Sequence, residues 1–429
     1  MGLRCQAAAG PTLFVDDMTE PDRQFMSRTR VVYIAVALPY NGATEEFFEP
    51  EVEELLCSGV DLLLAPRSLN GRLDQEKWGR LQCHFALAPL CSLSVLAVAV
   101  TEAVRRPVRT LSALILLRHS RTLGIFMKNL AVFPKALWVA RIARRWGADH
   151  IHAQWATTTG TMALIASEVT GIPWSMTLHR GDIVEDNLLQ EKLTRSRFSR
   201  FISESGIRLA CSICAETPAA SMGVIHMGIR IPPQSTAVKT SNHEKVILCP
   251  AFLIDVKGHT YLLRALAQLK QEGCNLRTLI AGKGPLRGAL EKEADELGIR
   301  DRVQFLGQVP REEILAFYEE GRVDMVVLPS VDLGDGLHEG IPVSLMEAMS
   351  YGVPVISTKT GGIAELLSDG AGVMVPEKDP ASLARAIRRV MEDETLRRQL
   401  SCEGRKRVAE HFDARKAAAL LHEVFTGRR

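Results

Sequence analysis

Short runs of apolar, β-branched residues alternate with amphipathic stretches along most of the chain. The segment "RVVYIAVALPYNG" (residues 30–42) predicts a buried strand followed by a loop. Apolar positions at helical spacing over residues 43–59 predict a helix, and "VDLLLAP" (residues 60–66) predicts a second strand. This alternation indicates a parallel sheet with helices on its faces.

The same rhythm returns at residues 149–182 and again beyond residue 245, on either side of a polar stretch, residues 228–245, that is rich in Pro, Ser and Thr. A chain of 429 residues also exceeds the usual size of one core. The pattern therefore predicts an α/β protein of two doubly wound, Rossmann-like domains facing across a cleft. The expected divisions are a poorly ordered leader (1–28), an N-terminal Rossmann-like domain (29–234), a C-terminal Rossmann-like domain (235–407), and a C-terminal helix packing back toward the N-terminal domain (408–429).

Composition narrows the function classes. Hydrophobic residues make up 46% and charged residues 24% of the chain, and the net charge of +2 gives no reason to expect nucleic acid as a partner. Nine scattered cysteines indicate reduced thiols, and the Cys211/Cys214 pair lacks the further ligands of a zinc site. Residues 1–30 lack the apolar run of a signal peptide, so we expect a cytoplasmic protein.

Residues 84–146 depart from this pattern. They contain ten Lys or Arg residues and one acid, Glu102, between long apolar runs. The first run, residues 85–100, includes Pro89 and is shorter than the ~20 residues of a spanning helix, which makes a transmembrane segment the less favoured interpretation. Two interpretations stay open: basic helices lying on an anionic membrane at its inner face, or helices that pack on the sheet with solvated arginines.

The richest chemistry lies in "HEGIPVSLMEAMSYGVPVISTKTGGIAEL" (residues 338–366). Pro342 suits the first position of a helix that we expect to end at Tyr351. The free N–H groups at its start favour a phosphate. Glu339 in the preceding loop and Glu347 inside the helix are then suited to accept hydrogen bonds from sugar hydroxyls. A nucleotide sugar carries both kinds of group, although on spacing alone both glutamates also fit ordinary surface positions.

This stretch, preceded by "PAFLIDVKGH", "LIAGKGP" and "VQFLGQV" and followed by "GAGVMVPEKDPASLARAI", resembles glycosyltransferase family 4, the retaining enzymes of the GT-B fold. The resemblance extends less sharply to the first domain through "DHIHAQWA", "TLHRGDI", "SRFISES" and "VIHMGI". The order of motifs is most like that of bacterial enzymes that build exopolysaccharide or other cell-surface glycans.

The resemblance implies roles for individual residues. His179 and Glu339 would contact the reacting sugar, and Glu347 would hold the ribose. The remaining donor-binding positions it implies are Lys257, Gly282, Gly284, Gly307, Val309, Gly340, Ile341, Pro342 and Val343. Gly42 and Asp182 are candidates for binding the acceptor or the diphosphate. Phe252 occupies the position of a family arginine, so a second phosphate contact is missing or comes from Lys283 or Arg287.

The function expected from these features is transfer of a sugar, with retention, from a nucleotide-diphosphate sugar to a glycan or lipid-linked acceptor. We expect no metal ion and no cofactor, because a helix terminus and a lysine can neutralise the leaving diphosphate. The alternatives are a non-catalytic nucleotide-sugar-binding subunit of a glycan assembly complex, or another GT-B enzyme such as an epimerase or a glycogen synthase-like protein.

Overall fold

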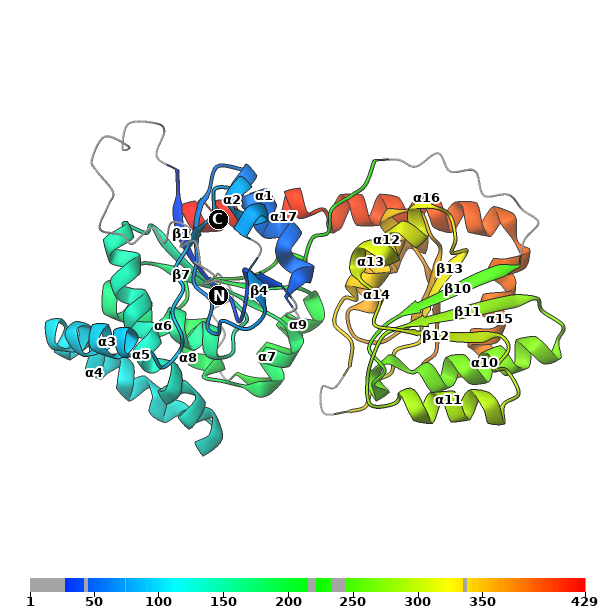
Figure 1. The fold of residues 1–429 in the computed structure, drawn as a ribbon, viewed down its shortest axis with the longest axis horizontal. Coiled ribbons are helices and arrows are strands. Elements are labelled where there is room, and N and C mark those ends of the chain that lie inside the picture. The colour runs from blue at the N-terminus through cyan, green and yellow to red at the C-terminus, as the bar shows by residue number, and fades with distance from the viewer. Residues whose placement is uncertain are drawn as a thin grey trace, which may run out of the picture.

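The computed structural model describes residues 28–41, 45–73, 75–214, 221–233, 244–334 and 338–428. They form two α/β domains side by side (Figure 1). The leader predicted over residues 1–28 lies outside the described residues except for Arg28, and Gly42 lies outside them as well.

The first domain is built on a seven-stranded parallel sheet of order β5-β3-β1-β6-β7-β8-β9. The central strands β6 and β7 are buried along their whole length, as expected of strands covered by helices on both faces. The strands are β1 Arg30–Ile34, β3 Asp61–Leu64, β5 His84–Phe85, β6 His150–Gln154, β7 Trp174–Leu178, β8 Phe198–Phe201 and β9 Met222–Val224, with a small antiparallel pair, β2 Tyr40–Asn41 and β4 Arg72–Leu73.

Helices cover both faces of this sheet. One apolar cluster packs α5 and α6 against it, and a second packs α1 and the C-terminal α17 on the opposite side. The helices are α1 Glu49–Cys57, α2 Gln75–Arg80, α3 Leu93–Arg105, α4 Pro107–Leu116, α5 Leu123–Trp146, α6 Thr158–Thr170, α7 Arg180–Glu185, α8 Leu189–Arg195 and α9 Glu204–Ile213, with short 3-10 turns η3 Glu46–Phe48 and η4 Leu117–His119.

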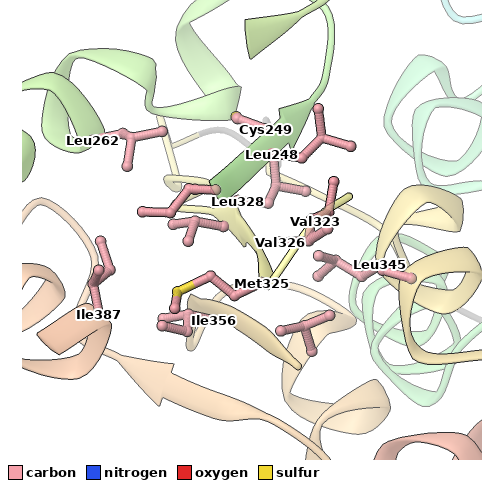
Figure 2. Packing of buried hydrophobic residues seen from close by; sticks show 14 of the residues in the cluster. Leu248, Cys249, Leu262, Val323, Met325, Val326, Leu328, Leu345, Ile356 and Ile387 are labelled. Atoms are coloured by element: carbon pink, nitrogen blue, oxygen red, sulfur yellow. The ribbon is translucent and has the colours of Figure 1, made fainter. Parts of the chain in front are cut away.

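The second domain is built on a six-stranded parallel sheet of order β12-β11-β10-β13-β14-β15. Leu248, Val326 and Ile356 stand at the centre of its core (Figure 2). Its strands are β10 Lys245–Pro250, β11 Leu276–Ala281, β12 Val303–Gly307, β13 Met325–Leu328, β14 Val355–Thr358 and β15 Val373–Val375. Its helices are η6 Asp255–Lys257, α10 His259–Gln271, α11 Arg287–Glu296, α12 Arg311–Glu319, α13 Val343–Ser350, α14 Ile363–Leu366, η7 Ser368–Gly370, α15 Pro380–Glu392 and α16 Glu394–His411.

The chain crosses between the domains twice, and the two crossings touch. Ile229 donates its N–H to the Phe412 carbonyl (2.8 Å) and accepts from the Ala414 N–H (3.0 Å). A Cβ on Gly228 would lie 2.4 Å from the Ala414 Cα, so the neighbouring position requires glycine. After this point α17 (Ala414–Thr426) packs on α1 of the first domain.

The boundary expected between residues 407 and 408 falls inside α16, and the Val408 side chain is buried in the core of the second domain. The chain therefore leaves that domain after Phe412 rather than at residue 407, because the helix that carries it continues to His411. The expected boundary at 234/235 lies outside the described residues.

The segment 84–146 forms β5, α3, α4 and α5. The apolar run 85–100 is no single helix, since α3 begins only at Leu93, after a loop that contains Pro89. In the described part of the chain, α5 alone is long and apolar enough to cross a membrane, and half of its most apolar window is buried inside the domain. We interpret α5 as a core helix, with α3 and α4 at the edge of the first domain that faces away from the second (Figure 1).

Candidate active site

The loop before α13 is held by the glycine pair that follows β14. A Cβ on Gly361, whose φ is +54°, would lie 1.8 Å from the Glu339 carbonyl oxygen, and a Cβ on Gly362 would lie 2.6 Å from Ile341 Cγ1. The Gly362 N–H donates to the same carbonyl (3.4 Å). The two glycines therefore let a turn pack directly against the backbone that carries Glu339.

Helix α13 begins one residue later than predicted. Pro342, with φ of −71° and ψ of 119°, occupies the N-cap, and α13 runs from Val343 to Ser350. No side chain caps this terminus, so the N–H groups of the first turn and the positive end of the dipole face outward beside Gly340 and Ile341. A Cβ on Gly340 would lie 4.0 Å from Ile202 of the first domain, so this terminus lies where the two domains meet.

Lys257 and Glu339, 82 residues apart, form an ion pair with a distance of 2.5 Å between Nζ and Oε2. Their side chains keep 16% and 15% exposure, which leaves both accessible to a ligand. The approach depends on Gly258, where φ is +67° and a Cβ would lie 1.9 Å from the Pro329 carbonyl oxygen. The structure thus brings together the two residues predicted to contact the diphosphate and the sugar.

Glu347 lies deeper, and its Oε1 accepts from Arg311 Nε at 2.5 Å. Burial raises the pKa of the Glu347 carboxyl, while the positive charge of Arg311 and its hydrogen bond act in the opposite direction. With the Glu347 side chain 8% exposed, a ribose would have to share this carboxylate with the guanidinium. Sequence reasoning missed Arg311, because "VPREE" carries no spacing that marks the arginine as a partner of a helix 36 residues further on.

Gly282 and Gly284 serve close packing of two backbone segments. Cβ atoms at these positions would lie 1.8 Å from the Ala251 carbonyl oxygen and 2.3 Å from that of Leu253. Between these two carbonyls stands Phe252, whose side chain is 52% exposed, at the position where the resemblance implies an arginine. A direct donor contact by either glycine stays a prediction.

Gly307 ends β12 with φ of +74°, and a Cβ there would lie 3.4 Å from Arg287 Nη1. Arg287 also pairs with Glu291 one turn further along α11. The segment from Gly307 to Val309 thus lies beside a guanidinium that is 43% exposed. Two cations could replace the missing arginine. Arg287 lies next to Gly307, a predicted donor-binding residue, whereas Lys283 is exposed.

His179 follows β7 in the first domain, at the N-cap of α7, and its ring lies against two aromatic side chains. Its ring stacks on Trp155 at 4.0 Å between centroids, with Phe47 edge-on at 5.8 Å. Tyr33 donates to the Gln154 side-chain oxygen (3.0 Å), which leaves the Gln154 amide nitrogen to donate to His179 Nε2 (3.0 Å). Burial lowers the pKa of His179 to about 3, so the ring is neutral at physiological pH.

Asp182 supports the His179 backbone. Its Oδ2 accepts from the N–H groups of His179 (3.0 Å) and Ala156 (2.9 Å), and the residue is 3% exposed. Burial raises the pKa of Asp182 to about 7. The sequence suggested Asp182 as a residue that binds the acceptor or diphosphate. The geometry favours a different role, since the carboxylate is occupied by backbone and turned away from solvent.

Two further buried charges that sequence reasoning missed fix the neighbouring loops. The Glu45 carboxylate accepts from the backbone N–H groups of residues 36–38 (2.6–2.9 Å) and from Trp155 Nε1 (2.7 Å). The Lys192 ammonium donates to the carbonyls of Ala156, Thr157 and Asn187 (2.5–2.8 Å). An acid in the loop after the first strand was visible in the sequence, but its partners are not local. The Glu45 carboxylate and the Lys192 ammonium thus fix the loops that surround His179.

The domains also touch away from these residues. The Glu365 carboxylate, on α14, accepts from the Glu204 N–H (3.1 Å) and lies 2.6 Å from His226 Nε2, both in the first domain. Across the described ranges, no three His, Cys, Asp or Glu side chains are grouped so that they could bind a metal ion. Cys211 and Cys214 form no disulfide.

Comparison with known proteins shows which family the second domain resembles. Residues 233–407 match the family model for "Glycosyl transferases group 1". Over this range the second domain is similar to the group 1 glycosyltransferases. It carries Lys257, Glu339 and Glu347, and the match spans all of the second-domain site described above.

Relatives and solved structures extend the comparison beyond that domain. The amylovoran biosynthesis glycosyltransferase AmsK of Erwinia amylovora is 31% identical over 255 residues, 57% of this chain and 62% of that protein. The putative colanic acid biosynthesis glycosyltransferase WcaL of Escherichia coli is 36% identical over 174 residues, 40% of this chain and 42% of that protein. The chain thus spans about two fifths to three fifths of the length of these relatives.

The crystal structure of Anabaena Alr3699/HepE in complex with UDP and glucose superposes with a TM-score of 0.68 at 17% identity, covering 93% of this chain and all of that one. This solved structure and the others that superpose on the chain are GT-B glycosyltransferases. The predicted fold class, two Rossmann-like domains, is therefore confirmed.

Proposed function

We propose that the protein is a retaining glycosyltransferase that moves a sugar from a nucleotide-diphosphate sugar to a hydroxyl of a glycan or lipid-linked acceptor during synthesis of cell-surface polysaccharide. One observation carries this proposal: the Lys257–Glu339 pair stands beside the uncapped N-terminus of α13, within a domain similar to the group 1 glycosyltransferases. A cation, a helix terminus and a hydroxyl-binding carboxylate then meet at one point where the domains touch.

The donor would lie with its diphosphate over the first turn of α13. The N–H groups of Val343 and Ser344 and the dipole attract the phosphate oxygens, and Lys257 supplies a full positive charge. Because an ammonium has three N–H donors, Lys257 can bind a phosphate oxygen while it keeps Glu339. The free oxygen of Glu339 then accepts from the hexose, and Glu347 from the ribose.

In the reaction the bond between the anomeric carbon and the leaving phosphate oxygen breaks. The acceptor oxygen forms its new bond on the same face, and the departing phosphate takes the acceptor's proton. Negative charge develops on the diphosphate, where α13 and Lys257 stabilise it without a metal ion. His179 is neutral, so it takes part as a hydrogen-bonding and stacking surface rather than as a proton donor.

The acceptor class rests on the relatives. The names of AmsK and WcaL refer to biosynthesis of amylovoran and colanic acid, and this supports a polysaccharide acceptor for the present chain. We place the reaction on the cytoplasmic side of the cell membrane, where a lipid-linked acceptor would present its growing end.

The test is a thermal-shift screen of nucleotide sugars, followed by assays of donor hydrolysis and transfer with the stabilising donor. Lys257→Ala and Glu339→Ala should lower kcat/KM by at least about tenfold each, the effect of losing one charged hydrogen bond of about 1.5 kcal/mol. Lys270→Ala is the matched control, since Lys270 forms a similar pair with Asp301 (2.6 Å) on the surface of the same domain. A donor shift that survives Glu339→Ala at full size would refute the role of Glu339.

A second candidate is a non-catalytic nucleotide-sugar-binding subunit, which the exposed Phe252 in place of a phosphate-binding arginine favours. It predicts a donor-induced thermal shift with neither hydrolysis nor transfer to lipid-linked acceptors. Phe252→Arg separates the two candidates: in an active enzyme it should tighten donor binding and keep turnover, whereas in a binding subunit it tightens binding alone.

A further inference from the structure

The first domain exposes an unusual share of the large apolar side chains. In the part of the chain that the structure describes, sixteen such side chains are exposed, and eleven of them lie on α3, α4 and the first two turns of α5. We call these eleven the apolar surface. They are Leu93, Leu96, Val100, Val104, Val108, Leu111, Leu114, Ile115, Leu123, Met127 and Leu130.

The exposure follows helical spacing. On α3 the four exposed positions, from Leu93 to Val104, fall within a sector of about 80° at ~3.6 residues per turn. The opposite face of the same helix buries Val95, Ala99 and Glu102. Each helix therefore has two apolar faces. One packs on the domain, and the other is exposed to solvent.

Contacts on the inner faces fix this orientation. The buried Glu102 carboxylate on α3 accepts two hydrogen bonds from Arg144 on α5 (2.7 and 3.1 Å), and Arg141 lies 3.7 Å away. At the α3–α4 corner, Arg106 and Arg109 donate to the Val169 carbonyl on α6.

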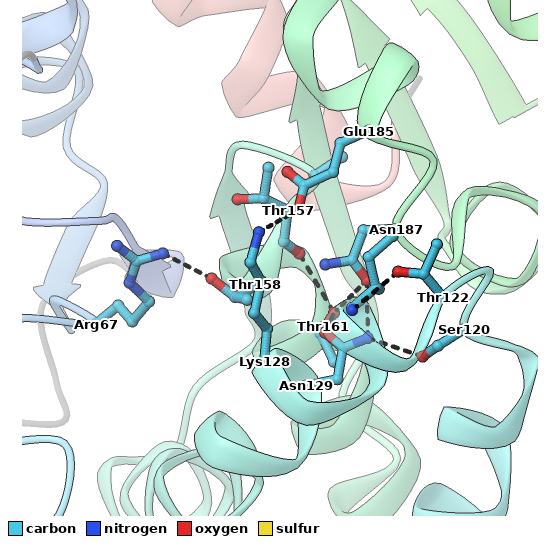
Figure 3. A network of polar contacts seen from close by, with 12 residues as sticks. Arg67, Ser120, Thr122, Lys128, Asn129, Thr157, Thr158, Thr161, Glu185 and Asn187 are labelled. Atoms are coloured by element: carbon cyan, nitrogen blue, oxygen red, sulfur yellow. Dashed lines mark hydrogen bonds and ion pairs between the residues drawn. The ribbon is translucent and has the colours of Figure 1, made fainter.

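The inner face of α5 is tied down in the same way. The buried Asn129 donates to Asn187 (2.9 Å) and accepts from Thr161 on α6 (2.9 Å), as Figure 3 shows. Polar side chains on all three helices form hydrogen bonds or ion pairs within the domain. None of the helices can therefore rotate to bury its outer face.

Charge identifies what this face fits. The single acid of residues 84–146, Glu102, is buried and paired, so the helices present no carboxylate to solvent. Arg105, Arg109 and Arg118 are exposed among or beside the apolar positions. At the border with α7 and α8 the basic residues meet acids, as in the Lys128–Glu185 pair (3.3 Å). The purely cationic part is therefore α3 and α4, because His119 of η4 also lies 2.5 Å from Glu191.

The composition points to lipid rather than to another protein. All eleven exposed side chains are aliphatic or methionine, and the exposed charges beside them on α3 and α4 are all positive, as on helices that lie at an anionic membrane surface. At 13 residues and ~1.5 Å per residue, α3 is about 20 Å long, too short to cross a hydrocarbon core of ~30 Å. Helices of this kind lie in the interface, with aliphatic side chains among the acyl chains and arginines at the headgroups.

We propose that α3, α4 and the start of α5 form a docking surface for an anionic lipid bilayer, with α3 and α4 lying in the plane of the interface. The surface lies at the end of the first domain that faces away from the second (Figure 1), so docking leaves the donor-binding domain in solution. This proposal does not depend on the chemistry of transfer, and it explains how the enzyme would meet a lipid-linked acceptor.

The test is flotation of the full chain with vesicles of phosphatidylcholine alone or mixed with phosphatidylglycerol. The protein should float with the mixed vesicles only. The triple variant Leu93→Gln/Val104→Gln/Val108→Gln should abolish flotation. The matched control is Ile254→Gln/Leu333→Gln/Met374→Gln, which removes three exposed apolar side chains from the second domain and should float like the wild type.

Charge is tested separately. Arg105→Gln/Arg118→Gln should weaken binding to the mixed vesicles by about 25-fold, or about fivefold for each basic residue. Lys292→Gln/Arg398→Gln, which removes the same charge from exposed helix positions of the second domain, should not. All these positions are exposed, so the variants should unfold at the temperature of the wild type.

Two results would overturn the proposal. One is a wild-type protein that stays at the bottom of the gradient with mixed vesicles. The other is a wild-type protein that is a dimer and does not float, together with an apolar-surface variant that is a monomer. A second copy of the chain would then cover the surface. Neither result bears on transfer to a soluble acceptor, which tests the proposed function independently.

Discussion

Replacing Arg311 by methionine should destabilise the second domain through Glu347. The substitution keeps an unbranched side chain but leaves a carboxylate that is 8% exposed without its cation. Breaking a fully buried ion pair costs about 3–5 kcal/mol. Because the Arg311 side chain is 31% exposed, water screens part of the interaction, and we expect about 2 kcal/mol.

The loss should depend on pH in a defined direction. Burial already raises the pKa of Glu347, and Arg311 is the largest influence that opposes it. Without Arg311 the folded-state pKa rises further above the unfolded value. The unfolded state then binds fewer protons than the folded state, so the domain gains stability as the pH falls toward 5 and loses it as the pH rises through the folded-state pKa. The defect should therefore be largest at pH 8.

Urea unfolding at pH 5 and pH 8 measures this effect. All five tryptophans lie in the first domain, so their fluorescence reports on that domain and far-UV circular dichroism reports on both. With a urea slope of about 2 kcal/mol/M, the circular dichroism midpoint should fall by about 1 M at pH 8 and by less at pH 5.

The control is Arg398→Met, which breaks an exposed pair with Glu394 on α16 and should cost less than about 0.5 kcal/mol. Adding Glu347→Gln to Arg311→Met should restore most of the loss at pH 8. An Arg311→Met protein with the same defect at both pH values would refute a role for the Glu347 charge.

Three further outcomes follow from the site. Gly361→Ala should abolish the donor-induced thermal shift because its Cβ meets the Glu339 carbonyl, whereas Gly370→Ala, with φ of +78° and nothing within 4 Å, carries similar backbone strain and should keep the shift. The pH dependence of kcat/KM between pH 5 and 8 should contain no titration of His179, whose pKa of about 3 lies below that range; a limb near pH 6.5 that vanishes in His179→Gln would contradict this. Glu365→Ala should raise the ratio of open to closed domain arrangements by roughly tenfold, because it removes at least one charged hydrogen bond of about 1.5 kcal/mol. The change should appear as a larger radius of gyration by X-ray scattering. An unchanged radius would indicate that other contacts hold the domains.

The sequence predicted the fold because the fold depends on local periodicity. Buried parallel strands produce short β-branched runs, and the helices between them carry one apolar face, so both sheets were visible before any contact was known. The exact ends were less certain. Pro342 suits both the N-cap and the first helical position, and α16 runs past the predicted boundary at residue 407 because its sequence contains no stop signal before Phe412.

The candidate site was predictable only in part. Glu339, Lys257 and the glycines were found because the chemistry of a nucleotide sugar and the family resemblance both point to them. Arg311, Glu45 and Lys192 were missed because each acts on a residue far away in the sequence, or on backbone groups that only the fold brings near. Likewise, periodicity alone could not decide which face of α3 is buried, since both faces are apolar and only Glu102 marks the inner one.

The pairing of the two glutamates also answers an electrostatic difficulty. Two unpaired carboxylates beside a diphosphate would repel it, and the repulsion would be strong in a partly buried site. In the structure Glu339 is paired with Lys257 and Glu347 with Arg311, so each clamp is close to neutral while it keeps oxygen atoms that can accept from hydroxyls. The attraction for the diphosphate then comes from the N-terminus of α13 and from the remaining N–H donors of Lys257. Without an arginine at Phe252, the charge of the diphosphate is therefore left to these two groups, and the ion pairs of Glu339 and Glu347 keep the carboxylates from adding repulsion to it.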